Sequence, residues 1–157
     1  MIEGRGEPLS QPAPVFKKTS ILVMIILTFI TAGIYWPIWF MTRQKAINGM
    51  HAKEKIGSAV FILAIVLFVI SLLVALGAGV LERLGGELLL AKGLETFSGV
   101  VHAIAAAAVL VQSFKVRRIF EEHFNVHGQQ GIAFSRVATF FFILYYLQYK
   151  INRMEPI

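Results

Sequence analysis

Three of the four histidines and one arginine are the residues whose type and position could support chemistry in this chain. His102 lies inside an apolar stretch, where an ionisable side chain is a functional candidate because lipid disfavours it. It could ligate haem or a metal, or relay protons, yet no second histidine stands in another apolar stretch. The alternative is a neutral His102 that bonds a backbone carbonyl or lies near the membrane interface.

His123 and His127 are four residues apart and follow two glutamates. On a continuous helix this spacing could hold a divalent metal ion. The Gly-Gln-Gln-Gly segment at 128–131 predicts that the helix ends near Asn125 and separates the pair. Both histidines would then be ordinary interfacial polar residues.

Arg136 is the third candidate, because it stands near the start of the last apolar stretch. It could pair with Glu121 or Glu122, or extend its side chain to lipid phosphates. A role in gating or in an ion path is the alternative to these structural roles.

Catalytic motifs are missing from the sequence. The chain has no cysteine, which excludes disulfides, iron–sulfur clusters, cysteine zinc sites and a cysteine nucleophile. No Ser-His-Asp arrangement or phosphate-binding glycine loop occurs, and all nine acidic residues lie outside the apolar stretches. A proton-coupled transporter would normally carry an acid within the membrane. We therefore predict neither an enzyme nor a bound cofactor.

His102 and Arg136 each lie in an apolar stretch, and the chain has four such stretches. The chain is 57% hydrophobic, against roughly 45–50% in soluble domains. Residues 56–81 and 96–114 are long enough to span, since about 20 residues cross a core of roughly 30 Å. We predict an all-α integral membrane protein, a compact helical bundle with these two firm transmembrane helices. One domain would cover residues 17–153, between a flexible polar, proline-containing tail at 1–16 and a short tail at 154–157.

The other two apolar stretches, residues 19–42 and 132–149, are predicted to be kinked or re-entrant. The residue before a proline avoids helical geometry, so the chain should break at Trp36 and Pro37. Residues 19–33 would then form roughly 22 Å of helix, too short to span. Gly33 and Pro37 are the predicted helix break. Segments 35–48 and 143–152 also share an aromatic pair followed by Gln, Lys, Ile and Asn, which supports treating the two stretches alike.

The basic residues bear on topology. If all four stretches span, the fifteen lysines and arginines divide seven against eight. If 19–42 and 132–149 are re-entrant, all except Arg83 and Lys92 lie on one side, thirteen against two. The positive-inside rule favours the second arrangement, with both termini in the cytoplasm. Whether the two weaker stretches span stays open at this point.

The net charge of +6 also indicates a partner. Because the basic residues flank apolar stretches, anionic lipid headgroups fit better than nucleic acid, for which no reading motif is present. Residues 113–125 and the stretch after Pro37 are predicted to be basic amphipathic interfacial helices. The expected headgroup or interface residues are Lys17, Lys18, Trp36, Trp39, Arg43, Lys45, Lys115, Arg117, Arg118, Arg136 and Lys150.

The stretch TFITAGIYWPIWF, followed by a basic helix that contains Asn48, and the closing YYLQYKIN form a recognisable pattern. It resembles family 4234 of the domains of unknown function, which are small bacterial membrane proteins. Gly33, Ile34 and Tyr35 would form its central motif, with Trp39 after them. The resemblance covers most of residues 17–153. It implies a multi-pass protein of the bacterial inner membrane, and no established activity, substrate or catalytic residue.

These observations lead to three functional hypotheses. The leading one is a non-enzymatic structural or scaffolding protein, or a subunit of a larger membrane complex, which contacts anionic lipids and forms homo-oligomers or binds a membrane partner. The alternative is a small oligomeric channel or transport component. The third is a haem or quinone subunit that uses His102.

Overall fold

The computed structural model describes residues 16, 18–127 and 134–153. Five α-helices follow one another: α1 (Ile21–Ile30), α2 (Tyr35–Asn48), α3 (Ser58–Arg83), α4 (Leu88–Glu122) and α5 (Arg136–Arg153). A single π-helical turn, η1 (His123–His127), continues α4. No strand occurs in these residues, so the predicted all-α class is confirmed for the described chain. The predicted tails lie outside it, except that Phe16 packs edge-on against Phe120 with ring centroids 5.6 Å apart.

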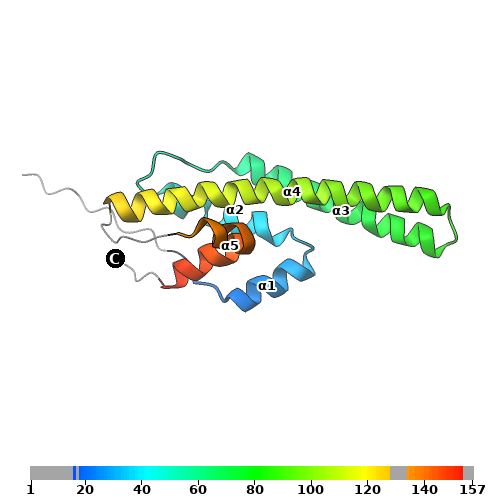
Figure 1. Ribbon diagram of the computed structural model, residues 1–157, viewed down its shortest axis with the longest axis horizontal. Helices are drawn as coiled ribbons and strands as arrows, with labels where there is room; N and C mark the ends of the chain where they lie inside the picture. The colour runs from blue at the N-terminus through cyan, green and yellow to red at the C-terminus, as the bar shows by residue number, and fades with distance from the viewer. Residues whose placement is uncertain (1–15, 17, 128–133, 154–157) are drawn as a thin grey trace, which may run out of the picture.

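Helices α3 and α4 form a long antiparallel hairpin (Figure 1). Two helices are long and apolar enough to cross a membrane: Ser58–Arg83, and α4 with the start of η1, Leu88–Asn125. The first lies within two residues of the predicted 56–81. The second contains 96–114 but is longer at both ends, because charged residues ended the apolar run without ending the helix. Residues 113–125 are therefore the end of α4 and the start of η1, not a separate interfacial helix as predicted.

The first apolar stretch is interrupted at residues 31–34, which include the predicted break residue Gly33 and precede Trp36 and Pro37. The chain turns over residues 31–34, where Ala32 and Gly33 have φ of 47° and 88°. This left-handed geometry suits a glycine, since it has no Cβ. Helix α2 begins at Tyr35, so Pro37 lies in its first turn. There the missing N–H of proline costs nothing, and the predicted role of Pro37 as the break is wrong.

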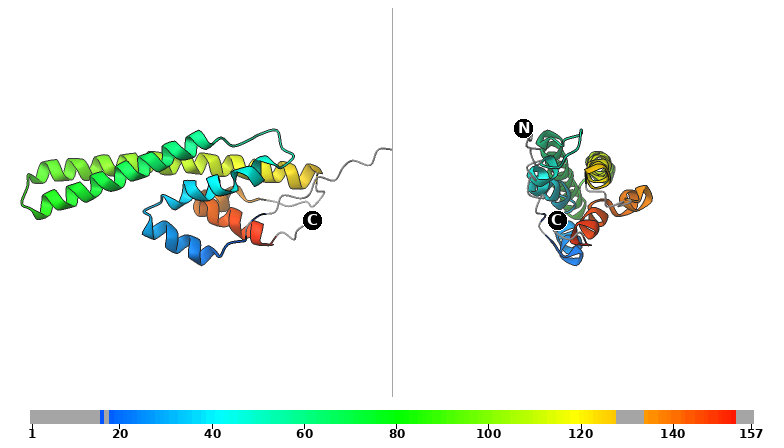
Figure 2. Two further views of the ribbon diagram at one scale, coloured as in Figure 1. Left: turned by 180° about the vertical axis from the view of Figure 1, so that it is seen from behind. Right: turned by 90° about the vertical axis from the view of Figure 1, so that its left-hand side faces the viewer.

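The turn makes α1 and α2 a second, shorter hairpin. Its turn points in the same direction as the tip of the α3–α4 hairpin but ends well short of it (Figures 1 and 2). Helix α5 packs against α1 and α4, and its backbone is kinked at Ile143, where φ is 43°. The last apolar stretch, of which residues 132–133 lie outside the described chain, is thus kinked as predicted.

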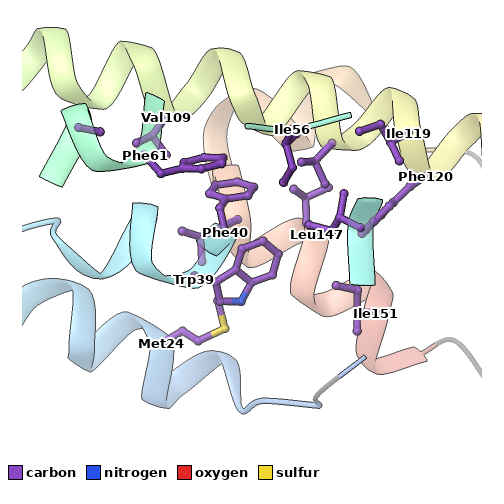
Figure 3. Close-up of a cluster of buried hydrophobic side chains, with 14 of the residues drawn as sticks. Met24, Trp39, Phe40, Ile56, Phe61, Val109, Ile119, Phe120, Leu147 and Ile151 are labelled. Atoms are coloured by element: carbon purple, nitrogen blue, oxygen red, sulfur yellow. The ribbon is translucent and has the colours of Figure 1, made fainter. Parts of the chain in front are cut away.

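The core lies where all five helices meet (Figure 3). At its centre the Phe40 and Phe61 rings stack with centroids 5.2 Å apart, and Trp39 meets Phe40 edge-on. Along α3 this core extends as far as Phe68, and along α4 it begins at Ala105. Beyond these two residues, in the described chain, α3 and α4 continue as a two-helix hairpin (Figure 1).

Candidate membrane interface

The described surface is apolar over much of its area. Large hydrophobic side chains point outward along α3 and α4, and equally along α1 and the first half of α5. Phe29 is 81% exposed and Phe141 is 70% exposed. Soluble monomers rarely expose contiguous apolar patches of more than a few hundred Å². This surface is therefore suited to lipid hydrocarbon.

Charged side chains gather at the two ends of the molecule. We call the end where α2, α4 and α5 finish the basic end (Figure 1). Its exposed or half-buried basic residues are Lys45, Lys53, Lys55, Lys115, Arg118, Lys150 and Arg153. At the opposite hairpin tip, Lys92 pairs with Glu82 at 4.0 Å and with Glu95 at 3.3 Å.

Two asparagines hold the chain just before each apolar hairpin, and we call these contacts the amide clasps. Asn48 donates from Nδ2 to the Ile56 carbonyl at 2.9 Å and accepts the Ile56 N–H at Oδ1, also at 2.9 Å. Asn152 donates to the Thr19 carbonyl at 2.8 Å and accepts the Thr19 N–H at 3.3 Å. Ile56 and Thr19 each stand two residues before a helix, α3 and α1 respectively.

A glutamine four residues earlier supports each asparagine. Gln44 donates to the Ile56 carbonyl at 2.9 Å, and Gln148 donates to Asn152 Oδ1 at 2.7 Å. In each of the two similar sequence segments, the Gln and Asn thus help to hold the chain before a hairpin. Together the clasps fix the starts of α1 and α3 to the ends of α5 and α2. Both hairpins therefore open toward the basic end.

Both tryptophans bond to α5. Trp36 Nε1 donates to the Tyr145 hydroxyl at 3.3 Å, and that hydroxyl donates to Thr28 Oγ1 at 2.7 Å. Trp39 Nε1 donates to Gln148 Oε1 at 3.0 Å. Trp39 is 0% exposed, so its predicted role as an interfacial lipid anchor is wrong. A tryptophan whose N–H finds a buried acceptor can place its whole ring in the core.

The family model for the domain of unknown function DUF4234 matches residues 19–154. This chain belongs to the DUF4234 family. The match begins at Thr19 and ends just beyond Asn152, so it includes both partners of that amide clasp. No curated protein and no solved structure matches the chain.

Two arginines of this DUF4234 chain that were predicted at lipid headgroups are buried instead. Arg43 is 7% exposed, lies over the Trp39 ring at 4.5 Å and donates to Thr19 Oγ1 at 2.8 Å. It therefore links α2 to the start of α1. The predicted headgroup contact is wrong because the planar guanidinium stacks on an aromatic face and bonds at its edge.

Arg117 is the second buried arginine, at 6% exposure. It forms an ion pair with Glu121 and donates to the Phe134 carbonyl at 3.1 Å. Of the two partners predicted for Arg136, Glu121 is engaged by Arg117 and Glu122 accepts the Lys53 N–H, while Arg136 itself is exposed. The apolar side of this part of α4, including Ile119 and Phe120, is buried in protein rather than in the headgroup layer.

The other predicted interface residues that the structure describes lie at the protein surface. Lys18, Lys45 and Arg118 are exposed, and Lys115 is half-buried. Lys150 is half-buried and places its ammonium 5.7 Å from the centre of the Phe134 ring. Lys17 lies outside the described residues.

His102 lies in a polar seam inside the α3–α4 hairpin. Its Nδ1 is 3.4 Å from Ser71 Oγ, and its ring meets Phe68 edge-on with centroids 4.9 Å apart. Ser71 and Ser98 each donate to the other's carbonyl, at 3.1 and 2.8 Å. The hydrogen-bonding partner of His102 is therefore the Ser71 hydroxyl and not the backbone carbonyl expected in the alternative prediction.

The loop at residues 49–57 contacts the end of α4 and the start of η1 through His51 and Glu54, which the sequence analysis did not identify. His123 Nδ1 accepts the His51 N–H at 3.1 Å, and the two rings stack with centroids 5.9 Å apart. Glu54 accepts two hydrogen bonds from Arg118, at 2.9 and 3.1 Å, which hold the pKa of Glu54 below its usual value. The side chain of His127 lies outside the description. Among the described residues of this DUF4234 chain, no three potential metal ligands gather.

Proposed function

We propose that this protein is a non-enzymatic scaffold of the bacterial inner membrane, or a subunit of a larger complex there. It enters the bilayer from the cytoplasmic face, keeps both termini on that face and organises anionic lipid around its basic end. The observation that carries this proposal is the turn at residues 31–34, which sends α2 back toward the end where α1 begins.

Helix lengths support this arrangement. The 26 residues of α3 correspond to about 39 Å, enough for a hydrocarbon core of roughly 30 Å. The 10 residues of α1 correspond to about 15 Å, or half of that core. The α3–α4 hairpin therefore crosses the bilayer, and the α1–α2 hairpin turns near its midplane.

Backbone hydrogen bonding at the turn also suits a lipid environment, which offers no partners to free backbone groups. Gly33 N–H donates to the Thr28 carbonyl at 3.0 Å, and Ile34 N–H donates to the Thr31 carbonyl at 3.1 Å. Tyr35 N–H donates to Thr31 Oγ1 at 3.0 Å. The turn thus satisfies its own donors where a membrane-exposed loop would need water.

Introduced cysteines test the topology directly, because the chain has none of its own. Single cysteines at Lys18, Lys45, Arg153 and Leu84 would be labelled with a membrane-impermeant maleimide in intact spheroplasts and in inverted vesicles. We expect the first three to react from the cytoplasmic side and Leu84→Cys from the other. Reaction of Lys18→Cys and Lys45→Cys from opposite sides would mean that the first apolar stretch spans, which refutes the proposal.

A further inference from the structure

The molecule is much thicker at one end than at the other. All five helices meet at the shared core, which ends at Phe68 on α3 and Ala105 on α4. From there to the hairpin tip, α3 and α4 alone continue among the described residues (Figures 1 and 2). About 15 residues of α3 lie beyond Phe68, which corresponds to roughly 22 Å of helix.

The thick section has an apolar outer surface of its own. Leu22, Phe29 and Ile30 are exposed on α1, and Val137 and Phe141 are exposed on α5. A cytoplasmic domain would carry polar side chains at these positions, so we place this section in hydrocarbon. Since α1 covers about half of the bilayer core, the thick section fills the leaflet next to the basic end.

We infer that the protein is a membrane wedge that favours a bilayer bent so that the leaflet at the basic end is convex. This inference rests on the proposed function, because it requires the one-sided entry of both hairpins. Five helices displace lipid from one leaflet, whereas two helices displace lipid from the other. The first leaflet must therefore hold more area, which outward bending of that leaflet supplies. Binding of amphipathic helices in one leaflet is sensitive to curvature for the same reason, because they occupy area on that side alone.

The partner of this apolar outer surface is a curved anionic bilayer, because basic residues lie at the basic end of the thick section. Lys45, Lys53 and Arg153 are exposed there, and basic side chains close to an anionic membrane surface are attracted to it. At the narrow tip, Lys92 pairs with Glu82 and Glu95, and residues 82–95 hold three acidic against two basic residues.

Tubes pulled from giant vesicles test the wedge with the full-length protein. Arg153→Cys and Leu84→Cys would each be reconstituted, in mixed orientation, into phosphatidylcholine–phosphatidylglycerol vesicles. An impermeant dye then marks only molecules whose cysteine faces outward. The outer leaflet of an outward-pulled tube is convex. We expect a tube-to-vesicle dye ratio above one for Arg153→Cys and below one for Leu84→Cys.

Equal ratios for the two variants, or the reverse order, would overturn the wedge. The topology is checked separately in a double-cysteine variant, labelled first outside and then, after solubilisation, with a second dye. One dye of each kind per molecule places the two cysteines on opposite faces. If that holds and the tube ratios are equal, the wedge alone fails. Two identical dyes per molecule would instead refute the proposed function.

Discussion

The side chain of Asn152 satisfies both backbone groups of a residue 133 positions away, and this contact allows a prediction at the scale of single residues. In Asn152→Ala the N–H and carbonyl of Thr19 lose their partners at the start of α1. A buried polar group without a partner costs about 1–3 kcal/mol, so we expect the free energy of unfolding to fall by about this amount. The measurement is denaturant titration in detergent, followed by tryptophan fluorescence.

Arg153→Ala is the matched control, because Arg153 is the next residue along α5 and is exposed. Its effect should stay within about 0.5 kcal/mol, as for most surface substitutions. If Asn152→Ala behaves like this control, the amide clasp contributes nothing to stability.

Glu54 gives a second prediction at this scale, which concerns pH. Its hydrogen bonds to Arg118 hold its pKa in the folded protein below the ordinary value of 4.5. The contribution of this carboxylate is therefore fully present above the unfolded-state pKa and is lost as the pH falls through the lower folded-state value. We expect the protection of residues 49–57 against hydrogen exchange, measured relative to the intrinsic exchange rate at each pH, to fall below about pH 4.5. Glu54→Gln should exchange faster at neutral pH and lose this acid step, and an unchanged acid step would contradict the assignment.

At the scale of elements, the turn between α1 and α2 depends on Gly33. A Cβ at this position would lie 3.1 Å from Cε1 of Phe68, and the φ of 88° is unfavourable for any side chain. We expect Gly33→Ala to reduce the free energy of unfolding by about 1–2 kcal/mol. Gly99→Ala is the control, because that helical position has open space, and it should stabilise by about 0.5–1 kcal/mol. Equal effects of the two substitutions would show that the turn tolerates other conformations.

The elements differ in how well the sequence predicts them. Helix α3 follows directly from an unbroken apolar run, and its observed bounds lie within two residues of the prediction. The length of α4 was underestimated because Lys92, Glu95 and Lys115 interrupt the apolar pattern, although all three are good helix formers. Of the two predicted break residues, Gly33 lies in the turn between α1 and α2, whereas Pro37 lies in the first turn of α2. Proline is a strong local signal in sequence, but the turn depends on Gly33 and on its fit against Phe68.

At the scale of the whole molecule, the sequence predicts which residue types form the candidate membrane interface. It does not predict which of those side chains are buried. Aromatic and basic residues in sequence are typical of a membrane interface, and Lys18, Lys45 and Arg118 are indeed exposed. Aromatic and basic residues also occur in the core, where Trp39 and Arg43 stack on each other. Only the tertiary contacts decide between the two, such as those of Trp39 with Gln148 and of Arg43 with Thr19. The amide clasps join residues far apart in sequence, so their partners had no local signal beyond the shared Gln and Asn spacing.

The charge asymmetry of the whole molecule leads to a prediction about lipid. Lys45 and Lys53 are exposed at the basic end, whereas Lys92 at the tip is engaged by Glu82 and Glu95. Replacing both Lys45 and Lys53 by Gln should weaken binding of phosphatidylglycerol by about 2 kcal/mol, since each basic residue near an anionic surface contributes about 1 kcal/mol. Lys92→Gln should leave the binding unchanged. Native mass spectrometry of lipids retained after mild detergent extraction would measure both variants, over a salt series because these attractions are screened. Equal loss from the two variants would show that lipid does not distinguish the ends, and the basic end would then have no special affinity for anionic headgroups.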